Sequence, residues 1–154
     1  WRTALDLQMI LHYGRYDGTL DARMQRRVIH ITDALIAGEG NGPLASTPVD
    51  SRFLTGALNA PAAEWIHARL MGFDPELIPL VREAFADLPF PLVPFPPSEI
   101  RMRLHGTDAP PDAVFPFEGR AFRPASGWEG HCELKNIHDQ KSGSPALVAE
   151  VPHS

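Results

Sequence analysis

The chain has 154 residues, of which 44% are hydrophobic and 21% are charged, and its formal net charge is -5 at pH 7. This length predicts a single domain with a sizeable core, and the composition is that of a soluble globular protein. The negative net charge gives no electrostatic reason to expect nucleic acid as a partner, and no apolar run is long enough to cross a bilayer or to form a signal peptide. We therefore expect a soluble, cytoplasmic protein with no nucleic-acid or membrane partner.

The first part of the sequence predicts one short helix and one strand. The helix is expected over residues 4–13, and Gly14 stands where it would end. The positions that fit one apolar helical face are Leu7, Ile10, Leu11 and Tyr13. The dipeptide Asp17-Gly18 is typical of a turn, and the apolar run over residues 28–31 predicts a buried strand.

The middle of the sequence predicts a strand and two helices. Residues 52–58 indicate a second strand, and Asn59 is a good N-cap for a helix that reaches Met71 or Gly72. Asp74 then caps one turn, and a further helix is expected from Leu80 to about residue 88. The residues expected to face the core are Ala62, Ile66, Leu70 and Phe73 in the first helix and Leu80, Val81, Ala84 and Phe85 in the second.

The last part of the sequence is rich in proline and aromatic residues. Five prolines lie within residues 89–97, which predicts an extended linker, and residues 99–104 alternate polar and apolar like a strand. Beyond it we expect an irregular segment anchored by aromatic side chains, and a tail over residues 135–154 that is partly disordered. The expected anchors are Phe115, Phe117, Phe122 and Trp128.

These elements predict an α/β fold with a small mixed sheet, flanking helices and a proline- and aromatic-rich irregular C-terminal part. The order of strand, helix, helix and strand over residues 52–104 favours a β-α-β crossover. We expect residues 1–134 to form one domain, with the proline-rich linker 89–97 inside it. Because the sequence begins at Trp1 within an apolar pattern, we also expect this domain to be one portion of a larger one.

Four phrases occur in order between Trp1 and Leu134: WRTALDLQMILHYGRYDGTL, ITDALIAGEGNGP, GALNAPAAEWIHARLMGFDPELIPLVREAF and PASGWEGHCEL. Together they resemble the later half of the domain of unknown function 362 family. The resemblance implies a soluble protein whose front half is absent, in a largely uncharacterised family that includes some iron–sulfur proteins. Glu64 stands where the family pattern usually has an aspartate. Cys132 is the single cysteine of the sequence, so this chain alone cannot hold such a cluster.

The strongest candidate for a site is the glycine-rich stretch that follows the apolar run. Asp33 lies within that run, where a buried carboxylate needs a cation or hydrogen bonds. Alternatively, it caps a short helical turn over residues 34–37 or anchors the backbone amides of the glycine-rich stretch. Glu39 would repel a phosphate, and oxygen ligands suit magnesium, manganese or calcium. The sequence therefore predicts Asp33 and Glu39 as ligands of a divalent cation, and the alternative is a purely structural turn. The cofactor- or substrate-binding residues would be Gly38, Gly40, Asn41 and Gly42.

Two further groups of residues carry weaker signals. Glu64 and His67 have the spacing of carboxylate-bridged di-iron helices, but without a second such pair an exposed helix edge is the better interpretation. His131, Cys132 and His138 do not have the paired spacing of zinc ligands, so we interpret their proximity as accidental.

Two functions of different classes are open, and the sequence does not decide whether the protein is an enzyme. The first is a redox-associated protein in which Asp33, Glu39 and Asn41 line a polar cleft that binds a divalent cation or a small polar substrate. The second is a non-catalytic scaffold or interaction lobe that packs against a missing N-terminal part or a protein partner.

Overall fold

The computed structural model describes residues 1–104, 106–111 and 121–135 of the chain. In chain order its elements are α1 (Arg2–Tyr13), β1 (His30–Asn41), β2 (Ala45–Ala57), α2 (Ala60–Leu70), the 3-10 turn η1 (Pro75–Leu77), α3 (Pro79–Ala84), the 3-10 turn η2 (Pro97–Glu99), β3 (Met102–Leu104) and β4 (Thr107–Ala109). They form a small α/β fold in which helices accompany two separate antiparallel sheets of two strands each. The expected α/β class is therefore confirmed.

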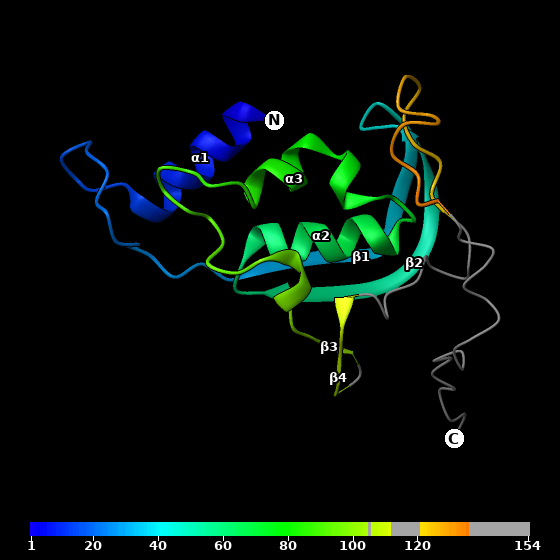
Figure 1. The fold of residues 1–154 in the computed structure, drawn as a ribbon. Helices are drawn as coiled ribbons and strands as arrows, with labels where there is room; N and C mark the ends of the chain where they lie inside the picture. Colours follow the sequence, from blue (N-terminus) through cyan, green and yellow to red (C-terminus); the bar gives the residue numbers. More distant parts are fainter. Residues whose placement is uncertain (105, 112–120, 136–154) are drawn as a thin grey trace.

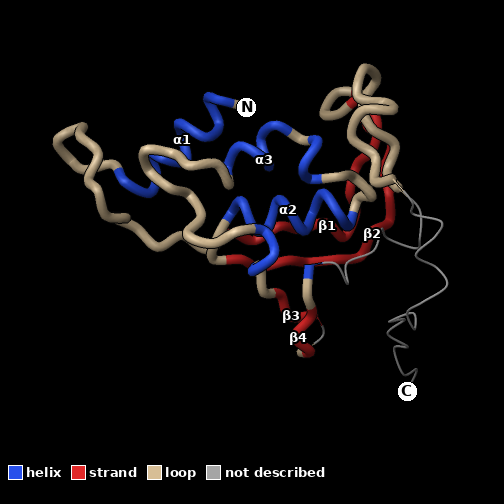
Figure 2. The backbone as a smooth tube through the Cα atoms, viewed as in Figure 1, coloured by secondary structure: helices blue, strands red, loops and turns tan. Residues whose placement is uncertain are grey.

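A long hairpin made of β1 and β2 is the largest element. Its strands pair antiparallel from His30 opposite Ala57 to Asn41 opposite Ala45, with an irregularity in register between Ala34 and Ile36. Bulges of this kind bend a strand, and Figures 1 and 2 show that the hairpin bends upward toward the end that carries the turn. The helix α2 lies on the concave side of this bend, and α3 and α1 lie beyond it (Figure 1).

The predicted β-α-β crossover is wrong. Within the described residues β3 pairs with β4 and not with the hairpin, and every strand pair is antiparallel. The glycine-rich stretch also differs from expectation, because it continues the first strand. Gly38 and Gly40 instead lie inside β1, so the strand continues to Asn41 and β2 returns directly after a short turn. The hairpin therefore consists of two consecutive antiparallel strands joined without a crossover.

The predicted helix boundaries rest on local signals and are mostly confirmed. α1 ends before Gly14, where an added Cβ would lie 2.5 Å from the carbonyl oxygen of Ile10. α2 follows Asn59, whose Oδ1 accepts a hydrogen bond from the Ala62 N–H at 3.0 Å. Asp74 caps η1 as expected. The last predicted helix, from Leu80 to about residue 88, is too long, since α3 ends at Ala84.

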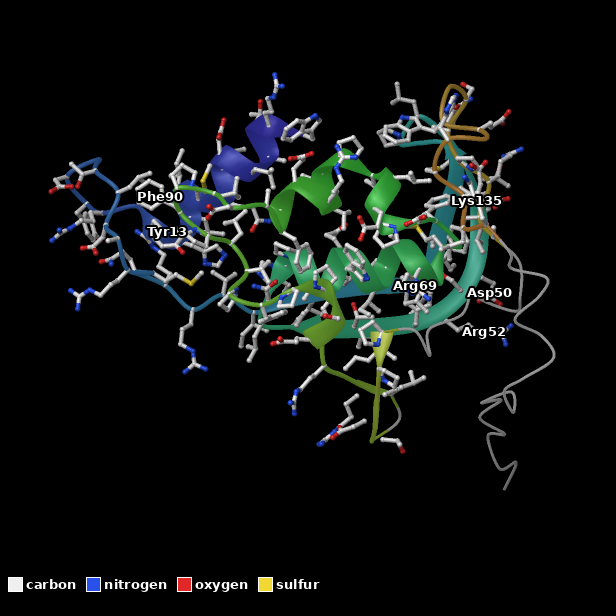
Figure 3. The ribbon with its side chains drawn as sticks, in the orientation of Figure 1. Tyr13, Asp50, Arg52, Arg69, Phe90 and Lys135 are labelled. Atoms are coloured by element: carbon white, nitrogen blue, oxygen red, sulfur yellow. The ribbon has the colours of Figure 1, made fainter. Side chains whose placement is uncertain are left out.

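The core lies between the three helices and the proline-rich segment, in two clusters. The first contains Leu5, Ala84 and Leu92, and the second contains Trp65, Val81 and Ile100. Residues 89–97 are irregular, as expected, but they are part of this core rather than a free linker, since Leu92 is 2% exposed. Figure 3 shows Tyr13 of α1 beside Phe90 of the same segment, and their rings are 5.2 Å apart.

Several expected buried faces are wrong. The strand around residues 28–31 is not buried, because Ile29 and Ile31 are 70% and 74% exposed. On α1 the buried residues are Leu5, His12 and Tyr13, while three of the four residues expected on its apolar face are exposed. Periodicity identifies an apolar face but does not say whether it meets the chain's own core, and these elements have apolar residues on more than one side.

The C-terminal part is described in one segment, residues 121–135, which we call the strap. Phe122 is 3% exposed and is an anchor as expected, whereas Trp128 is 43% exposed. The strap is held to the end of α2 by the Phe122 N–H, which donates to the carbonyl of Met71 at 2.7 Å. The expected anchors Phe115 and Phe117, and the expected tail beyond residue 135, lie outside the described residues.

Candidate functional site

The glycine-rich stretch at the far end of β1 binds the strap of the same chain. The backbone N–H of Arg123 donates to Glu39 Oε2 at 3.0 Å, and the Gly40 N–H donates to the Arg123 carbonyl at 2.8 Å. Asn41 Oδ1 accepts both the backbone N–H and the hydroxyl of Ser126, at 2.8 and 2.9 Å. The polar groups expected to hold a ligand therefore hold residues 123–126.

The glycines in this stretch are explained by close packing. Gly40 has a φ of +80°, and an added Cβ would lie 2.9 Å from the Arg123 guanidinium. At Gly38 an added Cβ would lie 3.1 Å from the Cβ of Ser46 on β2. The Gly42 N–H donates to the Gly40 carbonyl, so it is not free for an anion either. These contacts favour the interpretation as a structural turn.

Asp33 and Glu39 are not brought together. Asp33 is exposed and its Oδ1 accepts the N–H of Leu35 at 3.1 Å, in β1 rather than in a helical turn, so the alternative interpretation as a helix cap is wrong. Six residues along a strand span about 20 Å. Among the described residues no group of three or more His, Cys, Asp or Glu side chains is arranged to hold a metal ion. The predicted cation site has no support from this geometry.

His67 is a structural contact between α2 and the hairpin. It is 8% exposed, and its Nε2 lies 2.7 Å from the hydroxyl oxygen of Thr55 on β2. Its Nδ1 lies 3.8 Å from Glu64 Oε1, and Glu64 is on the exposed side of the helix. The expectation of an exposed helix edge is thus correct for Glu64 and wrong for His67.

Cys132 lies in the strap and is 3% exposed. Burial, followed by the negative charge of Glu133, raises the pKa of its thiol above the usual range. A thiol with a raised pKa is protonated at neutral pH and is a weak nucleophile. His138, which was considered with it, lies outside the described residues.

The most unusual surface is the convex side of the hairpin, which we call the outer face. Ile31 lies opposite Gly56 and Asp33 lies opposite Leu54, and side chains opposite each other in an antiparallel pair point to the same side. The outer face is formed by the aliphatic side chains Ile29, Ile31, Leu54 and Leu58, which are between 66% and 74% exposed. Leu35 and Ile36, at the bulge, are 55% and 73% exposed and extend the apolar surface.

Two further features accompany the outer face. Each strand of the hairpin has one partner within the described part of the chain, so both outer edges keep backbone groups that can pair with another strand. Asp50 and Arg52 lie together on the convex side (Figure 3), where their side chains form an ion pair at 2.5 Å. Within this ion pair the Arg52 guanidinium donates a hydrogen bond to Asp50 Oδ2, which lowers the pKa of Asp50.

A second exposed apolar surface lies on α1. Leu7, Ile10 and Leu11 are 61%, 54% and 41% exposed and form the α1 stripe. Because the sequence predicts a buried strand over residues 28–31, it does not indicate the outer face. The alternation of Leu54 and Leu58 with smaller or polar residues, opposite the same alternation at Ile29 and Ile31, was the signal that could have indicated it.

Comparison of the chain with models of protein families, with curated proteins and with solved structures gives no match. The resemblance to the domain of unknown function 362 family therefore stays a prediction. Across the described residues no helix has both the length and the apolar character needed to cross a membrane.

Proposed function

We propose that this chain is a non-catalytic interaction lobe whose outer face packs against an apolar surface of another polypeptide. The observation that carries the proposal is the exposure of Ile29, Ile31, Leu54 and Leu58, at 66% to 74%, on one side of a hairpin. Large contiguous apolar patches are rare on monomeric proteins and mark interaction sites.

Simple energetics favours an occupied outer face. Burying one aliphatic side chain completely contributes about 1.5–3 kcal/mol relative to leaving it exposed. A second sheet or a helix laid on this face would bury these four side chains together. Two-stranded hairpins are marginal alone, and α2 covers the concave side, so the convex side is where further packing would stabilise β1 and β2.

The alternative of a cation or substrate site in the glycine-rich stretch is less favoured. Glu39 and Asn41 accept hydrogen bonds from the strap, and Asp33 lies on the outer face. The occupant that we propose is an apolar sheet or helix face, supplied by a front lobe of the kind that the family resemblance implies or by a separate partner protein.

The proposal is tested with the chain alone by sedimentation velocity over a range of concentrations. An uncovered outer face should cause concentration-dependent association, and the double variant Leu54→Ser/Leu58→Ser should sediment as a monomer. The matched control is Leu44→Ser, which removes a side chain that is 99% exposed at the hairpin turn and should leave association unchanged.

A second control separates the two apolar surfaces. The variant Leu7→Ser/Ile10→Ser changes the α1 stripe and should associate like the wild-type chain. If this variant is monomeric and the outer-face variant is not, the association surface is α1 and the proposal is wrong. A wild-type chain that stays monomeric at every concentration would also contradict it.

A further inference from the structure

A cleft with a volume of about 560 Å³ lies between α1, the beginning of β1, α2 and α3. This volume is within the range of about 300–1,000 Å³ that is usual for small-molecule sites. Its walls combine polar and apolar surface, and the apolar side chains include Leu5 from α1 and Leu80, Val81 and Ala84 from α3. The side chains of Gln8, His30, Thr32 and Glu64 add polar groups from three different elements.

Two of these polar side chains carry atoms without a hydrogen-bond partner. Gln8 Oε1 and His30 Nε2 are both buried and unpaired within the described part of the chain. Buried polar atoms in folded proteins nearly always have partners. The amide oxygen of Gln8 is an acceptor, and His30 Nε2 is also an acceptor when the ring proton is on Nδ1. Both atoms therefore suit a group that donates hydrogen bonds.

The charge of the cleft indicates which donor fits. Glu64 is the one charged side chain among the residues that line it, and the sequence as a whole has a net charge of -5. A carboxylate here repels anions and attracts a cation. A divalent metal is a poorer fit, because calcium takes six to eight oxygen ligands and half of this wall is aliphatic.

We propose that the cleft binds a small organic ammonium compound with an apolar body. An ammonium group has three N–H donors, and Gln8, His30 and Glu64 supply three acceptors. The apolar body would lie against Leu5, Leu80 and Val81. Ile29 and Ile31 of the outer face also line the cleft, whereas Leu54 and Leu58 do not, so a variant changed only at Leu54 and Leu58 leaves the cleft lining intact.

The test is an NMR titration of amide chemical shifts with butylammonium, 1-butanol and butanoate, which share a chain length and differ in the head group. The monomeric Leu54→Ser/Leu58→Ser variant serves as the host, so that failure of association does not affect the result. Butylammonium should give saturable shifts at residues of the cleft, with an affinity at least about tenfold higher than that of 1-butanol. Butanoate should bind more weakly than either.

Two variants in the cleft and one control complete the test. Gln8→Leu and Glu64→Gln should each weaken butylammonium binding, by about tenfold for Glu64→Gln. Gln8→Leu should also raise the thermal midpoint, because it removes an unpaired buried oxygen. Glu76→Gln, at an exposed position outside the cleft, should change nothing. Equal affinity for butylammonium and 1-butanol, no saturable shift, or an unchanged affinity in Glu64→Gln would overturn the proposal.

Discussion

The two faces of the β1–β2 hairpin have similar apolar residues and opposite environments. On the inner face Ala34 is 7% exposed and Val49 is 5% exposed, whereas on the outer face Ile31 and Leu54 are 74% and 66% exposed. Residues close together in the same strands therefore differ in exposed fraction because α2 covers the inner face. The comparison teaches that aliphatic residues in a strand do not by themselves indicate whether the described part of the chain covers that face.

The largest expected effect comes from the helix that covers the inner face. Trp65 on α2 is 8% exposed and packs edge-on against Phe85, with ring centres 5.3 Å apart. Trp65→Ala should lower the free energy of unfolding by about 3–5 kcal/mol, because it leaves a large cavity. Urea denaturation measures this loss. The control is Trp128→Ala, which removes an exposed side chain and should lower the free energy of unfolding much less. Equal losses in the two variants would contradict the described core.

The next effect concerns the end of the hairpin that holds the strap. Gly40→Ala places a side chain at a φ of +80° and 2.9 Å from the Arg123 guanidinium. The backbone conformation alone should cost about 1–3 kcal/mol of stability. Gly42→Ala is the matched control, since an added Cβ there meets Ser46 at an ordinary 3.7 Å. Thermal unfolding measures the stability of both variants. If Gly42→Ala lowers the stability more than Gly40→Ala does, the close contact between Gly40 and the strap is wrong.

A smaller effect compares the two faces directly. Ser51 is 1% exposed, and its hydroxyl donates to the Ala34 carbonyl across the hairpin at 2.6 Å. Ser51→Ala should therefore cost about 0.5–1.5 kcal/mol of stability. Leu54→Ser, on the outer face, should change the stability of the monomer by less than about 0.5 kcal/mol. Urea denaturation at a concentration where the chain is monomeric checks both values. A larger loss of stability in Leu54→Ser than in Ser51→Ala would contradict the described difference between the two faces.

The smallest expected effect is the dependence of folding stability on pH that arises from Asp50, on the convex side of the hairpin. Arg52 lowers the pKa of Asp50 in the folded chain, so the folded state binds this proton more weakly than the unfolded chain does. Its contribution to stability is present above the unfolded pKa of about 3.9 and is lost as the pH falls through the lower folded pKa. In acid, Asp50→Asn should lose less stability than the wild type relative to neutral pH. Denaturation at several pH values measures the difference, and parallel curves would contradict the described pair.

The parts of the fold that follow from local chemistry could be predicted from the sequence. Asn59 and Asp74 accept backbone N–H groups two or three residues away, and Gly14 ends α1 through a contact with the preceding turn. The candidate site could not be predicted in this way. The partners of Glu39 and Asn41 lie 84 and 85 residues away in the sequence, and nothing local to residues 38–42 indicates that the strap will return to them.

The central claim is that the outer face of the hairpin is a binding surface. The most direct measurement is a map of amide chemical shifts as the concentration of the chain is raised. We expect changes to concentrate at Ile31, Leu54, Leu58 and their strand neighbours and to vanish in the Leu54→Ser/Leu58→Ser variant. Changes confined to the α1 stripe, or spectra that do not depend on concentration, would contradict the claim.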